Sequence, residues 1–249
     1  MLKLGTVAVV AFFSLSPPIG QDVAALKREI EQLKAQQAEM KRDLDAIKSF
    51  LQQLLRAPED NKLVDASVSI AGEPTKGSSS AKVTLVEVSD YHCPFCRRHM
   101  QQTQPQIDSD YINAGKLQYV FIDYPIAQLH PDAFKSHEAA NCASDQGKYW
   151  EMHNKLFAQP TKDPAQLVSH AQELGLDAGK LKACLDSGKY AKPVRDSVAR
   201  MEQLGIDSTP TFLLGLTPAP GQPMKVVKVV KGAMPFAEFK KAIDGVLTP

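Results

Sequence analysis

The stretch that decides the fold is Asp90-Tyr91-His92-Cys93-Pro94-Phe95-Cys96, which follows the apolar run 82–88. The run predicts a buried strand, and the residues after Cys93 predict a helix. A Cys-x-x-Cys pair at a strand-to-helix junction is suited to thiol–disulfide exchange. The first sulfur lies at the helix N-terminus, where unpaired N–H groups and the positive end of the dipole stabilise a thiolate. The second sulfur is close enough to resolve a mixed disulfide.

A Cys-x-x-Cys pair has three other common uses. Zinc needs a second pair of ligands, but Cys142 and Cys184 stand singly, 42 residues apart, and a cluster with His99 lacks a fourth ligand. Haem attachment needs a histidine directly after Cys96, where Arg97 stands. A purely structural disulfide is the third alternative, and a Pro-Phe bridge at a helix start is unusual for one. We therefore expect a redox site without a metal or cofactor.

Composition excludes several classes of protein. A chain of 249 residues forms one large domain or two small ones, and 43% hydrophobic residues supply a core. The net charge of +1 and the low aromatic content give no basic stripe for nucleic-acid binding. The four cysteines permit two disulfides.

The N-terminus indicates export. A basic start, Met1-Leu2-Lys3, precedes the apolar run 5–15, which is shorter than the ~20 residues of a membrane span and fits a secretory signal. Residues 14–20 contain Pro17-Pro18 and no clean cleavage site, so residues 1–20 are predicted to be either a cleaved signal peptide or a retained membrane anchor. Either case places the protein in the periplasm or bacterial cell envelope, where cysteines oxidise.

Residues 21–57 carry a heptad pattern. Apolar residues alternate at steps of three and four from Val23 to Leu54, with one polar break at Gln37. Such a narrow stripe favours a coiled coil that forms a homo-oligomer through residues 23–54, over a helix packed on its own domain. Dimer and trimer both stay open, since the a positions are Val23, Ile30, Gln37, Leu44 and Leu51, and the d positions are Leu26, Leu33, Met40, Ile47 and Leu54.

Beyond the heptads the pattern becomes α/β. Residues 58–81 are expected to form a linker with an edge strand near 66–70, and residues 82–249 a catalytic domain. Strands are predicted at 83–88, 117–122, 211–214 and 225–230, with helices near 93–113 and 236–246. Helical periodicity dominates about 131–205, with breaks at 159–160, 175, 188 and 205, so we expect a helical insertion in an α/β sheet.

Residues 82–247 resemble the DsbA family of thioredoxin-fold disulfide oxidoreductases. The resemblance is carried by Glu87 six residues before the first cysteine, by the stretch 89–96, and by Ser208-Thr209-Pro210-Thr211-Phe212, in this order. It implies a thioredoxin-like fold with a DsbA-type helical insertion. It also implies that Cys93 is the exposed nucleophile and Cys96 the buried resolving thiol.

The resemblance assigns further roles. Thr209-Pro210 would be a cis-proline loop that pairs with an extended substrate segment, whereas alone the motif would be read as an ordinary trans turn. Glu87 would help proton transfer at the resolving cysteine, and the alternative is an edge glutamate facing solvent. His92 favours the thiolate if it is charged and does little if it faces solvent.

The remaining supporting residues lie between the cysteines and in the insertion. Pro94 and Phe95 separate the cysteines, and Phe95 replaces the histidine of the family's strongest oxidant, which argues against very strong oxidising power. Some family members join a pair such as Cys142 and Cys184 in a second disulfide, and two small buried thiols are the alternative.

Three functions follow from these expectations. The leading one is a thiol:disulfide oxidoreductase that passes its disulfide to reduced exported proteins and is reoxidised by a membrane partner. The second is an oligomeric isomerase or reductase that acts on misoxidised proteins with the same site, which the heptads favour. A non-catalytic coiled-coil scaffold is the third, and the intact Cys-Pro-Phe-Cys and Thr-Pro motifs argue against it.

Overall fold

The computed structural model describes residues 26–27, 29–38, 40–41, 44 and 63–248. The chain divides into two compact units, Met1–Glu59 and Asp60–Pro249. In the first unit the described residues are helical, and their large apolar side chains are exposed, namely Leu26, Ile30, Leu33, Met40 and Leu44. The predicted signal or anchor at 1–20 lies outside the described residues. Among those described, no helix combines the length and apolar character that a membrane span requires.

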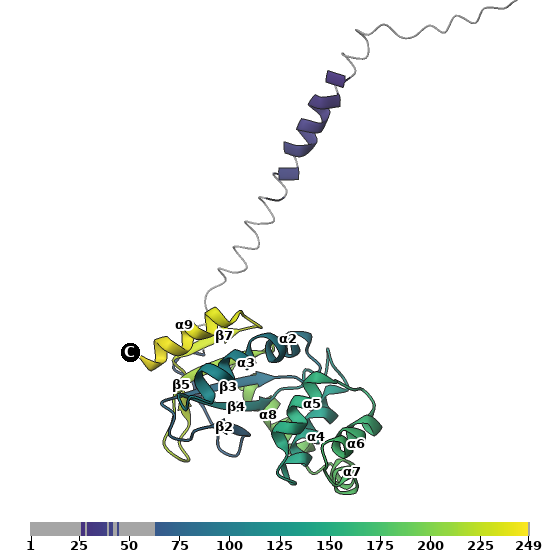
Figure 1. Ribbon diagram of the computed structural model, residues 1–249, viewed down its shortest axis with the longest axis vertical. Helices are drawn as coiled ribbons and strands as arrows, with labels where there is room; N and C mark the ends of the chain where they lie inside the picture. The colour runs from purple at the N-terminus through teal and green to yellow at the C-terminus, as the bar shows by residue number, and fades with distance from the viewer. Residues whose placement is uncertain (1–25, 28, 39, 42–43, 45–62, 249) are drawn as a thin grey trace, which may run out of the picture. The chain divides into compact units, whose positions relative to one another are not determined.

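The second unit contains the strands and most of the helices (Figure 1). Its strands are β1 (Ser67–Val68), β2 (Thr75–Gly77), β3 (Val83–Ser89), β4 (Leu117–Asp123), β5 (Thr211–Leu216), β6 (Met224–Lys225) and β7 (Lys228–Lys231). Its helices are α2 (Pro94–Gln102), α3 (Gln104–Ile107), the π-helical turn η1 (Asp108–Ile112), α4 (Ala133–Ser144), α5 (Tyr149–Ala158), α6 (Pro164–Glu173), α7 (Ala178–Ser187), α8 (Ala191–Gln203) and α9 (Phe236–Leu247).

A five-stranded sheet in the order β2-β4-β3-β5-β7 forms the centre of this unit. Strands β3 and β4 are parallel, and the other neighbours are antiparallel. Strand β3 is buried along its whole length because both faces of the sheet are covered, which explains its nearly continuous apolar sequence. This arrangement confirms the predicted α/β thioredoxin-like fold.

The two faces of β3 serve different cores. Val83 and Leu85 join the core that contains Cys96 and α9, whereas Val86 and Val88 join a second core with residues of α8, β1 and β6. Side chains alternate between faces with a period of two. Glu87 therefore lies on the same face as Leu85, toward the cysteines.

Residues 63–81 belong to the folded unit, which differs from the linker expected at 58–81. The predicted edge strand is β1, which pairs with β6 in a separate two-stranded sheet, and β2 pairs with β4 at the edge of the main sheet. Gly77 ends β2 with φ of +91°, and a Cβ there would lie 2.6 Å from the Leu117 carbonyl oxygen. The sequence did not predict that this segment folds with the domain, because its apolar runs are short and are buried only by partners far along the chain.

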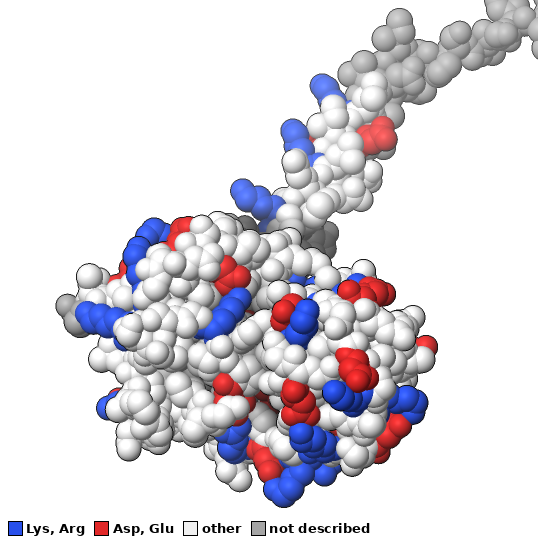
Figure 2. All heavy atoms as spheres, turned by 60° about the horizontal axis from the view of Figure 1, so that its bottom comes forward, with Lys and Arg blue, Asp and Glu red and all other residues white. Residues whose placement is uncertain are grey.

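Five helices, α4 to α8, form the insertion between β4 and β5, as predicted. The helices end close to the Gly and Pro positions at which the sequence predicted helix ends. Gly188 ends α7 in the left-handed conformation that suits glycine. On the face drawn in Figure 2, basic and acidic side chains are interspersed over this unit. Ion pairs of the insertion, such as Lys189 with Asp145 and Lys192 with Asp196, fit that pattern.

Candidate active site

The first cysteine is the N-cap residue of α2. Cys93 has extended backbone angles, Pro94 occupies the first turn, and the Arg97 N–H donates to the Cys93 carbonyl at 3.1 Å. Proline suits this position because the N–H that it lacks would have no partner inside the helix. The Cys93 N–H donates to the Asp90 carbonyl, so the turn from β3 into α2 holds the sulfur at the helix N-terminus.

The surroundings of Cys93 favour its thiolate. The pKa of Cys93 is lowered to about 6, chiefly by a hydrogen bond from the Cys96 thiol, against the opposing effect of burial. The Thr209 hydroxyl and the N–H groups of Cys96 and Phe95 contribute in the same direction. The Cys93 thiol lies 3.5 Å from the Thr209 carbonyl oxygen, to which it donates. We expected an exposed nucleophile, but Cys93 is only 4% exposed. The backbone of Thr209, from the segment before β5, lies against its sulfur.

Cys96 is fully buried one turn into the helix. Burial raises the pKa of Cys96 well above its usual value, and the neighbouring Cys93 and Glu87 charges raise it further. Both cysteines are free thiols in this structure. The two sulfurs therefore differ in acidity, so that the outer one ionises near neutral pH and the inner one keeps its proton.

A cis peptide bond joins Thr209 to Pro210, directly before β5. The Gly232 N–H donates to the Pro210 carbonyl at 2.8 Å and ties the loop to the end of β7. Beside Cys93 the loop presents the buried Thr209 hydroxyl, which makes no normal hydrogen bond to another described group and so remains available to the Cys93 thiolate. The arrangement sets a backbone segment against the reactive sulfur.

Glu87 is completely buried in the central strand, which contradicts an edge glutamate facing solvent. Its Oε2 accepts a hydrogen bond from the Tyr119 hydroxyl at 2.6 Å and lies 3.8 Å from His99 Nε2. Its Oε1 has no hydrogen-bond partner among the described residues. A carboxyl group in such a place can exchange a proton with the buried thiol on its own face of the sheet.

The His92 side chain points toward the insertion and is partly buried, and its surroundings do not favour the protonated ring. Its Nε2 lies 3.0 Å from the Ser136 hydroxyl of α4, and its N–H donates to Asp90 Oδ1 at 2.8 Å. Burial lowers the pKa of His92, so the ring is neutral near pH 7. It therefore supplies a contact with the insertion rather than a cation for the thiolate.

Phe95 is the exposed member of the motif. The residue is 53% exposed, and its ring centroid lies 5.2 Å from the Arg98 guanidinium carbon. An exposed aromatic ring beside the reactive cysteine offers an apolar contact to a bound chain.

Cys142 and Cys184 form a disulfide that joins α4 to α7, with Cα atoms 6.0 Å apart. Cys142 is buried and Cys184 is partly buried in the main core. Within the described part of the chain, no group of three or more His, Cys, Asp or Glu residues is arranged to hold a metal ion. His99 instead has Gln104 as its partner.

The sequence did not assign a role to four residues of the site, namely Asp90, His130, Tyr119 and His99. Asp90 is buried and accepts from the Ile126 N–H at 2.8 Å, with its Oδ2 2.9 Å from His130 Nδ1. Tyr119 and His99 approach Glu87 from β4 and α2. The spacing of His99, one helical turn after Cys96, indicated a shared helix face, whereas the pairing of Tyr119 with Glu87 needs the strand register.

A nucleophilic and a buried thiol beside a cis-proline loop, in this fold, define a DsbA-like thiol:disulfide oxidoreductase. The chain belongs to the thioredoxin family, whose sequence profile matches residues 69–244. The structure is similar to oxidised BdbD from Bacillus subtilis, with a TM-score of 0.64 and 26% identity over 75% of this chain and 99% of that chain. The DsbA-type resemblance is thereby confirmed.

Two curated relatives differ in how much of their length is matched. Disulfide bond formation protein D of Bacillus subtilis is 26% identical over 202 residues, which is 76% of this chain and 83% of that protein. The Na(+)/H(+) antiporter NhaA 3 of Salinispora tropica is 32% identical over 140 residues, which is 56% of this chain and 21% of the antiporter. The chain thus spans about a fifth of that longer relative, and the antiporter's name describes the whole of that longer protein.

Proposed function

We propose that the protein exchanges the Cys93–Cys96 disulfide with exported protein substrates in the bacterial cell envelope. The observation that carries this proposal is the unequal acidity of the two thiols, with the Cys93 pKa at about 6 and the Cys96 pKa raised. A thiolate that is stable near neutral pH is both a nucleophile and a good leaving group. The name of the Bacillus subtilis relative, Disulfide bond formation protein D, supports the oxidising direction.

The reaction follows from these properties. A substrate thiolate attacks the Cys93 sulfur of the oxidised enzyme, the Cys93–Cys96 bond breaks, and its electron pair passes to Cys96, which takes up a proton. A second substrate thiolate attacks the substrate sulfur of this mixed disulfide. The substrate disulfide forms and Cys93 leaves as a thiolate. The enzyme is reduced by two electrons, and a membrane redox partner restores its disulfide.

The loop at Thr209-Pro210 is proposed to bind the substrate. An extended peptide would pair with backbone groups of this loop in the manner of strand addition, beside the Cys93 sulfur. The exposed Phe95 ring gives the same peptide an apolar contact. Glu87 is proposed to move the proton of Cys96, His92 to hold the motif against α4, and the Cys142–Cys184 disulfide to stabilise the insertion.

Cofactors are not needed for this chemistry, because the electrons stay on sulfur throughout. The envelope is proposed from the basic and apolar N-terminal sequence, which suits a cleaved signal or a retained anchor. The substrates would be reduced exported proteins.

A disulfide isomerase or reductase is the second candidate, and the exposed apolar residues of the N-terminal helix favour it. Leu26, Ile30, Leu33, Met40 and Leu44 share the predicted heptad seam and are exposed in a single copy of the chain. Burying such side chains is worth about 1.5–3 kcal/mol each, which favours a homo-oligomer through residues 23–54. Several active sites around a shared space would suit misoxidised substrates.

Activity assays separate these candidates. The full chain is tested for oxidation of a dithiol peptide, reduction of insulin and recovery of scrambled ribonuclease, with Cys93→Ser as the inactive control. Light scattering then compares the full chain with a deletion of residues 21–56, which leaves the unit 60–249 intact. We expect the truncated protein to be a monomer that keeps peptide oxidation and loses most isomerase activity. A monomeric full chain would overturn the oligomer, and an active Cys93→Ser variant would overturn the site.

A further inference from the structure

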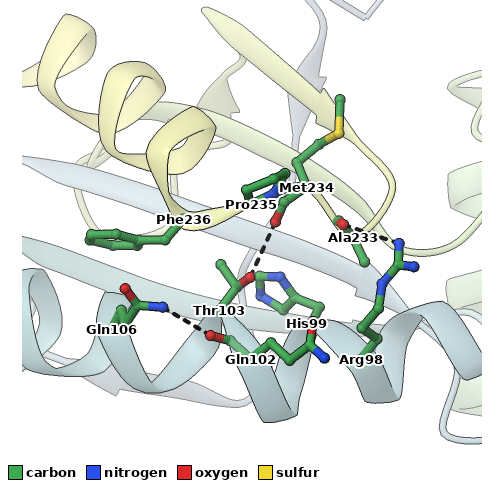
Figure 3. Close-up of a pocket in the computed structure, with 9 residues that line it drawn as sticks. All are labelled: Arg98, His99, Gln102, Thr103, Gln106, Ala233, Met234, Pro235 and Phe236. Carbon is green, nitrogen blue, oxygen red and sulfur yellow. Dashed lines mark hydrogen bonds between the residues drawn. The ribbon is translucent and has the colours of Figure 1, made fainter.

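His99 lies between the buried carboxyl group of Glu87 and a cavity on the surface. The ring is fully buried, one turn beyond Cys96, against the rings of Phe212 and Phe239 at centroid distances of 4.4 and 4.9 Å. It also lines a cavity of about 580 Å³ between α2 and the segment 233–236. Figure 3 shows the imidazole between these two walls, beside Thr103.

The hydrogen-bond network determines which nitrogen of His99 carries a proton. Gln104 Nε2 donates to Asp108 Oδ1 at 2.7 Å, and a carboxylate can only accept, so the amide of Gln104 has one orientation. Gln104 Oε1 therefore faces His99 Nε2 at 3.0 Å and accepts its hydrogen. Nδ1 is left with a lone pair and has no hydrogen-bond partner among the described residues.

The protonated nitrogen is also the one nearest to Glu87. His99 Nε2 lies 3.8 Å from Glu87 Oε2, which is beyond hydrogen-bond length but within reach of a small movement of either side chain. One edge of the ring thus holds a hydrogen beside the buried carboxyl group, and the other edge can accept a hydrogen.

We propose that His99 relays protons between the cavity and Glu87 during disulfide exchange. This inference rests on the proposed role of Glu87 at Cys96. His99 acts through Glu87 and does not touch the reacting sulfurs, so it is a positioning residue for the proton. Its hydrogen-bonded partner Gln104 keeps it in the donating tautomer.

The proton balance of the exchange fits this orientation. When the Cys93–Cys96 bond breaks, the Cys96 sulfur receives the electron pair and takes a proton through Glu87, which draws the Nε2 hydrogen of His99. The buried Nδ1 of the same ring accepts a proton from the cavity side when the cavity wall moves aside. On reoxidation the reverse sequence carries the Cys96 proton through Glu87 to Nε2, Nδ1 releases its proton to the cavity, and the ring returns to its first tautomer.

Three other charged groups lie around His99. Asp108 reaches it through Gln104, Lys76 forms an ion pair with Asp108 at 2.8 Å, and Arg98 lines the same cavity. Burial lowers the pKa of His99, while the Glu87 charge acts in the opposite direction. The neutral ring is therefore the resting form near pH 7, as a relay requires.

The test compares variants that keep the packing. His99→Phe preserves an aromatic ring against Phe212 and Phe239, and Gln104→Leu removes the acceptor that would otherwise be left buried without a partner. Oxidised full-length protein is mixed with a reduced dithiol peptide at pH values from 5 to 8. The reaction is quenched with acid, and its products are measured by mass spectrometry. We expect the His99→Phe/Gln104→Leu variant to react about tenfold more slowly than wild type at pH 7, and Gln104→Leu alone, which keeps the ring but loses its acceptor, to lie between them. The Cys93 pKa, measured by thiolate absorbance, should be the same in all three.

Chemical rescue separates a relay from a structural role. His99→Ala opens the ring site to the cavity, and imidazole should accelerate this variant about threefold or more. Gln102→Ala, which enlarges the same cavity and leaves His99 in place, should not respond to imidazole. A wild-type rate in His99→Phe/Gln104→Leu, or equal imidazole responses in His99→Ala and Gln102→Ala, would overturn the relay. If Glu87→Gln slows exchange but His99→Phe/Gln104→Leu does not, only the relay fails; if Cys93→Ser remains active, the proposed function fails.

Discussion

Cys93 and Cys96 are three positions apart at a helix N-terminus, whereas Cys142 and Cys184 are 42 positions apart and join two helices of the insertion. The first pair is reduced in the structure and beside a cis-proline loop, and the second pair is joined. Reactivity follows from the difference in stabilisation of the thiolate, not from the presence of two neighbouring cysteines. Each prediction below changes one side of this comparison.

The largest effect is expected from removal of the reactive sulfur. Cys93→Ser should lower insulin reduction by about a thousandfold or more, because no other thiol of the pair ionises near neutral pH. Cys96→Ser should instead accumulate mixed disulfides with substrate, visible by mass on non-reducing gels. The control is Cys142→Ser/Cys184→Ser, which should keep its exchange rate. Trapping by Cys93→Ser rather than Cys96→Ser would reverse the assigned roles.

Removal of the second pair should act on stability. Closing a loop of 42 residues is worth about 4 kcal/mol in the chain-entropy model, so the free energy of unfolding of Cys142→Ala/Cys184→Ala should fall by about that amount. The urea midpoint should fall accordingly. Circular dichroism measures the loss against wild type, with exchange activity followed in parallel. A loss of activity at temperatures where the variant is folded would contradict a purely structural bridge.

The pH dependence of alkylation compares the sulfurs of the reactive pair directly. Iodoacetamide should modify Cys93 with a midpoint near pH 6, and Cys96 should stay unmodified at neutral pH because burial raises its pKa. At pH 7 the thiolate fraction of Cys93 should be about thirtyfold that of an ordinary thiol of pKa ~8.5. After allowance for its lower intrinsic nucleophilicity, we expect Cys93 to react about two- to threefold faster than such a thiol. Peptide mapping identifies the alkylated residue, and earlier modification of Cys96 would contradict the assignment.

The same pKa shift predicts how stability varies with pH. The Cys93 pKa is lower in the folded protein than in the unfolded chain, so the stabilisation is present at high pH and is lost as pH falls through about 6. Between pH 6 and 8 the reduced wild type should therefore gain stability relative to reduced Cys93→Ser. Urea unfolding at each pH measures the gain. Parallel curves for the two proteins would show that the thiolate is not stabilised by folding.

The smallest effect is expected from the loop that faces Cys93. Thr209→Val removes a hydroxyl that lowers the Cys93 pKa and keeps the shape of the side chain. We expect the Cys93 pKa to rise and the rate of alkylation at pH 6 to fall by about threefold. Thiolate absorbance measures the pKa, with Ser208→Ala as the neighbouring control. An unchanged midpoint would leave Cys96 and the helix N-terminus as the main stabilising groups.

Local sequence was enough to predict the elements that depend on near neighbours. The apolar run before Cys93, the cysteine spacing, the proline in the first turn and the glycine breaks of the insertion all predicted their structures, because strand burial, helix starts and left-handed turns depend mainly on adjacent residues. Strand β2 was missed because three residues at 75–77 form a strand only against β4.

The sequence by itself determined the chemistry of the site, which requires two thiols of this spacing at the start of a helix. Only the tertiary structure decided that Cys93 is covered, that Glu87 is buried beside Tyr119, and that His99 lies between Glu87 and a cavity. The physical reason is that acidity and proton exchange depend on burial and on partners brought together by packing. Thr209 is 116 residues from Cys93 along the chain, and its effect on the thiolate exists only in the folded protein.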